Sequence, residues 1–435
     1  MIDLNNREKH IIETVDQLAE EMVDFACRLV AEPSTVGHEM SVLRVMENQL
    51  KHLGFSAERI SMDQSSLGKH PGFATVPWDD ENRYNLVAVE KPVGAGGRSA
   101  LFNGHLDVVS PEPTAFWKQD PFVPQIRDGW LYGRGAGDMK AGVAAMTYAL
   151  YAVKKAGYGL NAPVTIEAVI EEECSGNGAL ACIQAGHDAE AVLIPEPFGP
   201  TILTHQVGVL WFKVKVKGSP RHVQSAPAGT NAIEKSYSLI DALRQLEADL
   251  NQKEIPAAYR DVDHPLNLNI GILHGGDWPS TVPAEAEFHG RMSFFPGVVY
   301  SDICRQITET IEQTAKSDSW LRENPPKIEF YGFRSDGHGI SRDLPALALL
   351  NACHKSLTGQ DAEEYIATCT TDLRAFQHFG QGQSTCYGPV AENIHAANER
   401  VKVGSVIHVA KTYALFLARW CGLAAEASSR SEKGQ

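Results

Sequence analysis

Two short segments of this chain carry side chains that can bind metal ions. Gly104-His105-Leu106-Asp107 follows an apolar run, and Gly133-Arg134-Gly135-Ala136-Gly137-Asp138-Met139-Lys140 comes further along. Each segment brings a histidine or a carboxylate from the end of a predicted strand into a glycine-flanked turn. More carboxylates and another histidine follow: Glu171, Glu172, Glu173, Glu196 and His395. Carboxylates that bridge two cations, with imidazoles completing each shell, suit a two-zinc site, so the pattern predicts a two-metal hydrolase.

Each of these features has an alternative interpretation. A histidine after an apolar strand is more often structural, although Asp107 can orient the ring of His105. The three glutamates could form a solvated surface, but they follow the β-rich run 164–170, and sites form at strand ends in α/β sheets. The stretch 133–140 resembles a phosphate-binding loop but fits neither common pattern of such loops. We therefore favour metal binding over nucleotide binding.

Length and charge limit the classes of partner. A chain of 435 residues exceeds one ordinary core, so two domains are expected. A formal net charge of -15 argues against nucleic acid and against an anionic membrane surface, since both attract basic faces. No apolar run approaches the ~20 residues that span a bilayer, and the N-terminus lacks an export signal pattern. We expect a cytoplasmic protein that binds a small molecule.

Hydrophobic periodicity predicts an α/β domain interrupted by a second domain. Helices are expected over 8–30 and 141–155, and strands over 85–89, 100–102 and 164–170. After Thr204 the pattern changes. The expected elements are a strand over 208–217, a helix over 231–250, strands over 266–273 and 285–294, a helix over 301–316 and a strand over 327–333. This βαββαβ order is that of a split βαβ unit.

The ligand segments, in their order along the chain, resemble those of the M20 metallopeptidase and deacylase family. That family includes acetylornithine deacetylase, succinyl-diaminopimelate desuccinylase, aminoacylase and carboxypeptidase G. The resemblance extends from Pro33 to the helix after His395. It implies an α/β zinc-hydrolase catalytic domain with a mixed sheet and flanking helices, formed by residues 1–206 and 334–435. It also implies an inserted α+β, ferredoxin-like lid and dimerisation domain over residues 207–333.

The resemblance assigns a role to each candidate ligand. Asp138 would bridge two Zn²⁺ ions, for which Co²⁺ or Mn²⁺ could substitute, and the peptide bond from Asp138 to Met139 would be cis. The remaining metal ligands would be His105 and Glu196 on one ion, and Glu173 and His395 on the other. Asp107 would orient His105, and Glu172 would be the general base. Relatives usually carry aspartate where this chain has Glu171, a position outside the chemistry.

The implied reaction is hydrolysis of an amide by a metal-bridging hydroxide. Glu172 would take the proton of the water and return it to the leaving amine. His222 would stabilise the oxyanion from the other subunit of a homodimer formed through the lid domain. Arg291, Arg374 and Asn231 are the candidate substrate-binding residues, because guanidinium groups suit a carboxylate. A surface or structural role is the alternative for each arginine.

The function predicted first is therefore a dizinc amidohydrolase that removes an N-acyl group from an amino acid or small amine. Acetylornithine deacetylase is the preferred relative, because the stretch 171–179, Glu-Glu-Glu-Cys-Ser-Gly-Asn-Gly-Ala, resembles that subgroup. Removal of succinyl from diaminopimelate, deformylation of an aminopyrimidine, and dipeptide or carboxypeptidase cleavage remain open. A non-catalytic metal- or ligand-binding homologue is the alternative from another class, and it would be expected to have lost ligands.

Overall fold

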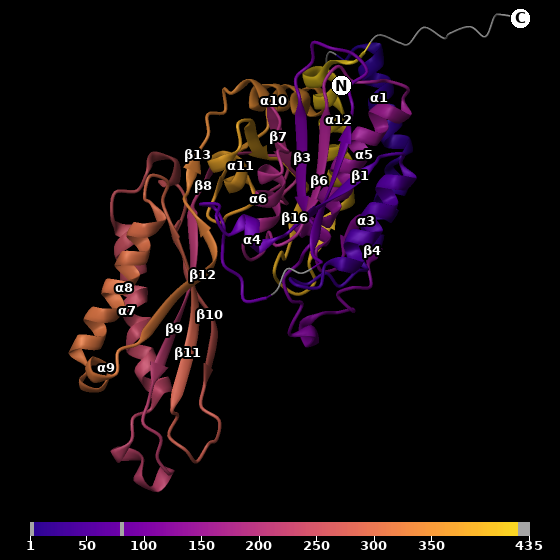
Figure 1. Cartoon of the computed structure of the whole chain (residues 1–435). Helices are drawn as coiled ribbons and strands as arrows, with labels where there is room; N and C mark the ends of the chain where they lie inside the picture. The colour runs from indigo at the N-terminus through magenta and orange to yellow at the C-terminus, as the bar shows by residue number, and fades with distance from the viewer. Residues whose placement is uncertain (1–3, 79–81, 425–435) are drawn as a thin grey trace, which may run out of the picture.

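The computed structural model describes residues 4–78 and 82–424. It contains two bodies, a larger one built around a six-stranded sheet and a smaller one that projects from it (Figure 1). Each has its own hydrophobic core, and Phe102 belongs to one and Phe212 to the other. Among the described residues, no helix is long and apolar enough to cross a membrane.

The six-stranded sheet is mixed, as expected from the family resemblance. Its strands, in spatial order, are β1 (Ala57–Ser61), β2 (Tyr84–Glu90), β6 (Val164–Val169), β3 (Ala100–His105), β7 (Ala191–Ile194) and β15 (Gln383–Cys386). Strands β6, β3, β7 and β15 run parallel to one another, whereas β2 runs antiparallel to both of its neighbours, β1 and β6. Every residue of β3, β6 and β7 is buried, as sheets covered on both faces require. The carboxyl ends of these strands share one edge, which positions the predicted ligands.

Helices cover both faces of this sheet. In Figure 1, α1, α3 and α5 lie on one side, and α6 and α11 lie on the side nearer the smaller body. The helices of the larger body are α1 (Asn6–Gln17), α2 (Ala19–Val30), α3 (Met40–His52), α4 (Gln64–Leu67), α5 (Ala141–Lys155), α6 (Asn177–Gln184), α10 (Pro345–Thr358), α11 (Leu373–Phe379) and α12 (Val403–Leu417).

The single helix predicted over 8–30 is in fact two helices. The break falls at Leu18, where φ is -91° and ψ is 0°. Hydrogen bonds from Leu18 N–H to Thr14 O and from Met22 N–H to Leu18 O continue the helical path across the break. The apolar spacing therefore runs through it unchanged, and periodicity alone does not reveal it.

The smaller body is the βαββαβ unit that the sequence predicts. It comprises β9 (Gly208–Lys217), α7 (Ala232–Gln252), β10 (Leu268–Gly275), β11 (Glu285–Phe294), α8 (Tyr300–Ser317), a short α9 (Ser319–Glu323) and β12 (Lys327–Ser335). The strand order is β10-β11-β9-β12, with every pair antiparallel. Along the distal half of β9, Val214 and Val216 are buried while Lys215 and Lys217 are exposed, so the sheet has one open face. We call this body the lid.

Two small sheets complete the larger body. One contains β13 (His338–Gly339), β8 (Ile202–Gln206) and β14 (Glu364–Ala367), and its β8 leads into the lid while β13 leads out. The other contains β16 (Ala391–Glu392), β17 (Arg400–Lys402), β5 (Trp130–Tyr132) and β4 (Gln125–Arg127). The segments that follow β5 and β16 carry Asp138 and His395. This second small sheet therefore brings together ligands that lie far apart in the chain.

Candidate metal centre and active site

Four of the predicted ligands converge at the carboxyl edge of the large sheet. Nε2 of His105, the last residue of β3, lies 3.1 Å from Oδ1 of Asp138. Nε2 of His395 lies 3.3 Å from the other oxygen of Asp138 and 3.2 Å from Oε2 of Glu173. Each oxygen of Asp138 thus faces a different imidazole. The fifth predicted ligand, Glu196, is buried just beyond the end of β7.

These separations fit a pair of divalent cations bridged by Asp138. Tetrahedral Zn²⁺ with bonds of about 2.0 Å to nitrogen and oxygen holds its donors about 3.3 Å apart. Donor atoms of His105, Asp138 and Glu173 all lie within 4.8 Å of one another. Each of the two oxygens of the Asp138 carboxylate could therefore bind one ion, which supports a bridging role for this residue.

The charges at the site favour bound cations. Burial raises the pKa of Glu172 and of Glu196 well above the ordinary value, and this effect outweighs the lowering by His105. Burial alone would lower the pKa of His395, yet the carboxylates of Glu173 and Asp138 raise it to about 11. Carboxyl groups thus outnumber the histidines in a buried place, and bound divalent ions would let the carboxyl groups with raised pKa ionise.

Asp107 organises the site in a way that differs in detail from the prediction. Nδ1 of His105 lies 2.9 Å from the main-chain oxygen of Asp107 and 3.6 Å from its carboxylate. The carboxylate oxygens instead accept the main-chain N–H groups of Glu172 and Glu173, at 3.3 and 3.0 Å. With a proton on Nδ1 held by the carbonyl oxygen, Nε2 of His105, which faces Asp138, is the nitrogen that could bind a metal ion.

Glu399 shapes the loop that carries Asp138, a role that sequence reasoning missed. Its carboxylate accepts N–H groups from Gly135, Gly137 and Asp138, at 2.8 to 3.0 Å, and pairs with Arg134. Gly135 has φ of 77°, and a Cβ there would lie 2.4 Å from Val108, so only glycine fits. The peptide bond from Asp138 to Met139 is cis, as the resemblance implies. The one sequence signal for Glu399 is its place four residues after His395.

Glu171 is also buried and structural. Its carboxylate accepts hydrogen bonds from Trp78 at 2.8 Å and Ser175 at 2.6 Å, and it pairs with Arg83. Arg83 in turn contacts Glu39 at 2.7 Å. This network holds the turn after β6, so Glu171 supports the two glutamates that follow it.

A cavity of about 410 Å³ connects the candidate ligands with the lid. Glu172, Glu173 and His395 line one side of it. The other side is formed by the proximal part of the lid sheet, with Trp211, Asn269, His289, Arg291, Tyr331 and Phe333. Trp211 makes edge contacts with Phe333 and Tyr331, at 5.0 and 5.9 Å between ring centres. The cavity thus has carboxylates on one wall and aromatic rings on the other.

The predicted substrate-binding residues lie in three different places. Arg291 lines the cavity, and its guanidinium donates only weakly, to Thr368 O at 3.3 Å and Asn267 O at 3.5 Å. Arg374 is buried beneath Glu172, with Nη1 3.4 Å from Oε1. Asn231 caps α7 through the N–H groups of Ile233 and Glu234, at the distal end of the lid.

His222 also lies at the distal end of the lid. Trp211 lines the cavity, whereas Lys217 ends the same strand about 20 Å away, at ~3.3 Å per residue. His222 follows Lys217, and it is exposed and bridges to Thr281. Within this chain, His222 therefore lies far from the candidate metal centre.

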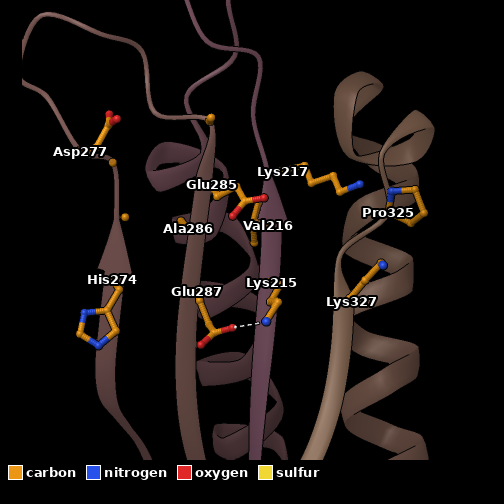
Figure 2. Close-up of a pocket in the computed structure, with 13 residues that line it drawn as sticks. Lys215, Val216, Lys217, His274, Asp277, Glu285, Ala286, Glu287, Pro325 and Lys327 are labelled. Atoms are coloured by element: carbon orange, nitrogen blue, oxygen red, sulfur yellow. Dashed lines mark ion pairs between the residues drawn. The ribbon is translucent and has the colours of Figure 1, made fainter.

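A larger cavity, of about 640 Å³, lies elsewhere on the lid. Figure 2 shows its lining on the open face of the sheet, with the helices behind, and Lys215 paired to Glu287 at 3.2 Å. Lys217, His274 and Lys327 lie on the same face. The candidate ligands His105, Asp138 and Glu173 are absent from its lining. The smaller cavity, beside the converging carboxylates, is therefore the candidate active site.

Residues 101–419 match the peptidase family M20/M25/M40. The chain belongs to this family. It is 28% identical over 368 residues to an N-formyl-4-amino-5-aminomethyl-2-methylpyrimidine deformylase of Halalkalibacterium halodurans, covering 80% of this chain and 85% of that protein. A protein of the same name from Bacillus subtilis is 26% identical over 437 residues, with 95% and 96% covered. A dipeptidase structure from Saccharomyces cerevisiae superposes with a TM-score of 0.79 at 14% identity, covering 95% and 98%.

Membership of the M20 family explains the arrangement at the sheet edge. The protein is a metal-dependent hydrolase of amide bonds. The likeness to the dipeptidase at 14% identity concerns the fold alone.

Proposed function

We propose that the protein is a two-zinc hydrolase that removes a small acyl group from the nitrogen of an amine. The observation that carries this proposal is the Asp138 carboxylate, whose two oxygens each face a different histidine. Two bound divalent ions would polarise the amide carbonyl and lower the pKa of water. His105 and Glu196 would hold one ion, and Glu173 and His395 the other.

Glu172 is the proposed general base. Its carboxylate is buried, lines the cavity and lies next in sequence to the proposed ligand Glu173. It would accept a proton from the attacking water and deliver it to the leaving amine. The lid wall would exclude bulk water from this transfer.

For the substrate, we favour an N-formyl group on an aminopyrimidine-like amine. Two relatives are named as deformylases of this kind. The rings of Trp211, Tyr331 and Phe333 line the cavity and can stack on a planar heterocycle. Acetylornithine is the second candidate, because its carboxylate could pair with Arg291. The Arg291 guanidinium lines the cavity and forms no ion pair with a carboxylate of the described residues.

We further propose a homodimer in which the lid of each subunit completes the site of the other. His222 and Asn231 lie at the distal end of the lid, remote from their own metal ligands. If they act in catalysis, a second subunit must supply them. A cytoplasmic location is part of the same proposal.

A hydrolysis screen with metal analysis tests the proposed function. Purified protein loaded with Zn²⁺, Co²⁺ or Mn²⁺ would be assayed on N-formylaminopyrimidine, acetylornithine, succinyl-diaminopimelate and a dipeptide. We expect two metal equivalents per chain and fastest turnover of the formyl substrate. Fastest turnover of acetylornithine would favour the second candidate. Two bound metals without turnover of any compound would instead favour a non-catalytic binding protein.

A further inference from the structure

Arg374 lies directly under the proposed general base. It is 5% exposed and belongs to the first turn of α11. Its Nη1 lies 3.4 Å from Oε1 of Glu172 and donates to Thr371 O at 2.9 Å. Among the described residues, Arg374 is the one side chain that donates a hydrogen bond to the Glu172 carboxylate.

The other end of the guanidinium is equally enclosed. Nη2 lies 3.7 Å from Oδ1 of Asp372, a carboxylate that is 1% exposed. A Cβ at Gly176 would lie 2.1 Å from Nη2, so the backbone packs tightly against it. Nη1 therefore donates to protein acceptors, whereas Nη2 faces the Asp372 carboxylate without a hydrogen bond among the described residues. Because the side chain is only 5% exposed, little of Arg374 is left to contact a substrate.

The lid covers the face of this guanidinium with an aromatic ring. The centre of the Phe333 ring, on β12, lies 4.6 Å from Cζ of Arg374. This cation–π contact is largely desolvated, which strengthens it. Phe333 also touches Trp211, at 5.0 Å between ring centres, so the contact continues into the lid wall of the cavity.

An irregularity in β12 points Phe333 toward the larger body. The pairing register of β12 with β9 shifts between Tyr331 and Arg334. At Gly332 φ is 59°, and a Cβ would lie 2.6 Å from Trp211 and 3.0 Å from Cys174 O. The Gly332 N–H donates to Thr75 O at 3.0 Å, which joins the lid to the larger body. Bulges of this kind redirect side chains near active sites.

We propose that Arg374 is a positioning residue that orients the Glu172 carboxylate, and that Phe333 is the lid side chain that holds Arg374 in place. This inference rests on the proposed role of Glu172. It differs from the expectation that Arg374 binds the substrate carboxylate. The lid would then influence the orientation of the general base Glu172. The contacts that connect them run from Trp211 to Phe333, from Phe333 to Arg374, and from Arg374 to Glu172.

The kinetic constants distinguish the two roles of Arg374. In Arg374→Ala, kcat should fall about 10- to 100-fold, because a misplaced catalytic group costs this much. KM should change less than about twofold, because Arg374 is not expected to contact the bound substrate. Free guanidinium ion should restore part of kcat. A rise in KM with kcat unchanged would overturn the proposal in favour of substrate binding.

Milder variants keep the proposal testable if Arg374→Ala fails to fold. Arg374→Lys keeps one charge, and Phe333→Leu keeps apolar volume while removing the ring face. Each should lower kcat severalfold with two metals still bound, and unchanged kcat in both would overturn the proposal. Arg334→Ala is the matched control, because Arg334 lies over the Tyr300 ring at 5.1 Å on the exposed side of β12. It should leave kcat unchanged.

A structural measurement separates this inference from the proposed function. Crystal structures of the wild type and of Arg374→Lys or Arg374→Ala would report the Glu172 carboxylate directly. We expect it to rotate away from its wild-type orientation when the guanidinium is lost. An unchanged Glu172 would overturn the inference even if the enzyme is active. A rotated Glu172 in a protein that hydrolyses nothing would support it while refuting the proposed function.

Discussion

A buried glutamate at the centre of the large sheet should contribute stability that is lost as pH rises. Glu167 on β6 and Asn103 on β3 are register partners, and both are fully buried. Asn103 Nδ2 donates to Glu167 Oε2 at 2.9 Å, while Oε1 of Glu167 and Oδ1 of Asn103 lack a donor. A proton on Oε1 of Glu167 would add a hydrogen-bond donor beside two oxygens that have none. The neutral, protonated form of Glu167 therefore suits this position.

Burial, with smaller contributions from Asp372 and Asp188, raises the pKa of Glu167 from 4.5 to about 8. The folded state therefore holds a proton that the unfolded state loses above pH 4.5. The stabilisation is fully present below pH 4.5 and is lost as pH rises toward 8. Each unit of pH in this window costs about 1.4 kcal/mol, so between pH 5 and pH 7 the loss is about 2 to 3 kcal/mol.

Glu167→Gln should remove this dependence. Glutamine keeps the acceptor for Asn103 Nδ2, adds a donor and has no charge to bury. We expect the variant to gain about 2 to 3 kcal/mol of unfolding free energy relative to wild type on going from pH 5 to pH 7. Urea unfolding at several pH values, at one fixed metal concentration, measures this difference.

A surface substitution provides the control for this experiment. Glu190 pairs with Arg98 at 2.9 Å and is 51% exposed, so Glu190→Gln should change stability little. A difference between Glu167→Gln and wild type that stays constant from pH 5 to pH 8 would refute the reasoning, because it would mean that Glu167 is ionised in the folded protein.

The remaining predictions concern the metal centre. Glu172→Ala should keep both metal ions but lower kcat by about 10²- to 10⁴-fold, whereas loss of metal would mean that Glu172 and Glu173 exchange roles. His105→Ala and His395→Ala should each leave one metal equivalent, in different sites, as measured by metal analysis and Co²⁺ absorption spectra. Identical spectra for the two variants would contradict separate ions. Mixing His222→Ala with Glu172→Ala protomers should restore activity in heterodimers, and no recovery despite proven subunit exchange would argue that His222 serves its own chain or is structural.

Regular segments were predictable because their periodicity is local. The predicted bounds 141–155 of α5, 208–217 of β9 and 285–294 of β11 are confirmed. Strong alternation or an alanine-rich run leaves little ambiguity over such lengths. At Leu18, by contrast, the spacing continues through a break, so the pattern carried no information about it.

The site was predictable only as far as its motifs extend. His105, Asp138, Glu173 and His395 lie together in the structure, while their roles as ligands stay a prediction. The support around them was not foreseen, because Glu399 lies 265 residues from Arg134 in sequence. The sequence around Glu399 does not indicate that its carboxylate binds the loop that carries Asp138. The contact of Arg374 with Glu172 was missed for the same reason.

The lid enters and leaves the larger body through two paired strands. Gln206 at the end of β8 lies opposite His338 at the start of β13. Antiparallel partners of this kind are about 5 Å apart, so the chain enters and leaves the lid at nearly the same place. The lid also has a hydrophobic core of its own. An exchange of the lid would carry the aromatic wall, Phe333 and His222 together while the candidate metal ligands stay in the larger body. It would therefore be expected to alter the support of Glu172 through Arg374 as well as the choice of substrate.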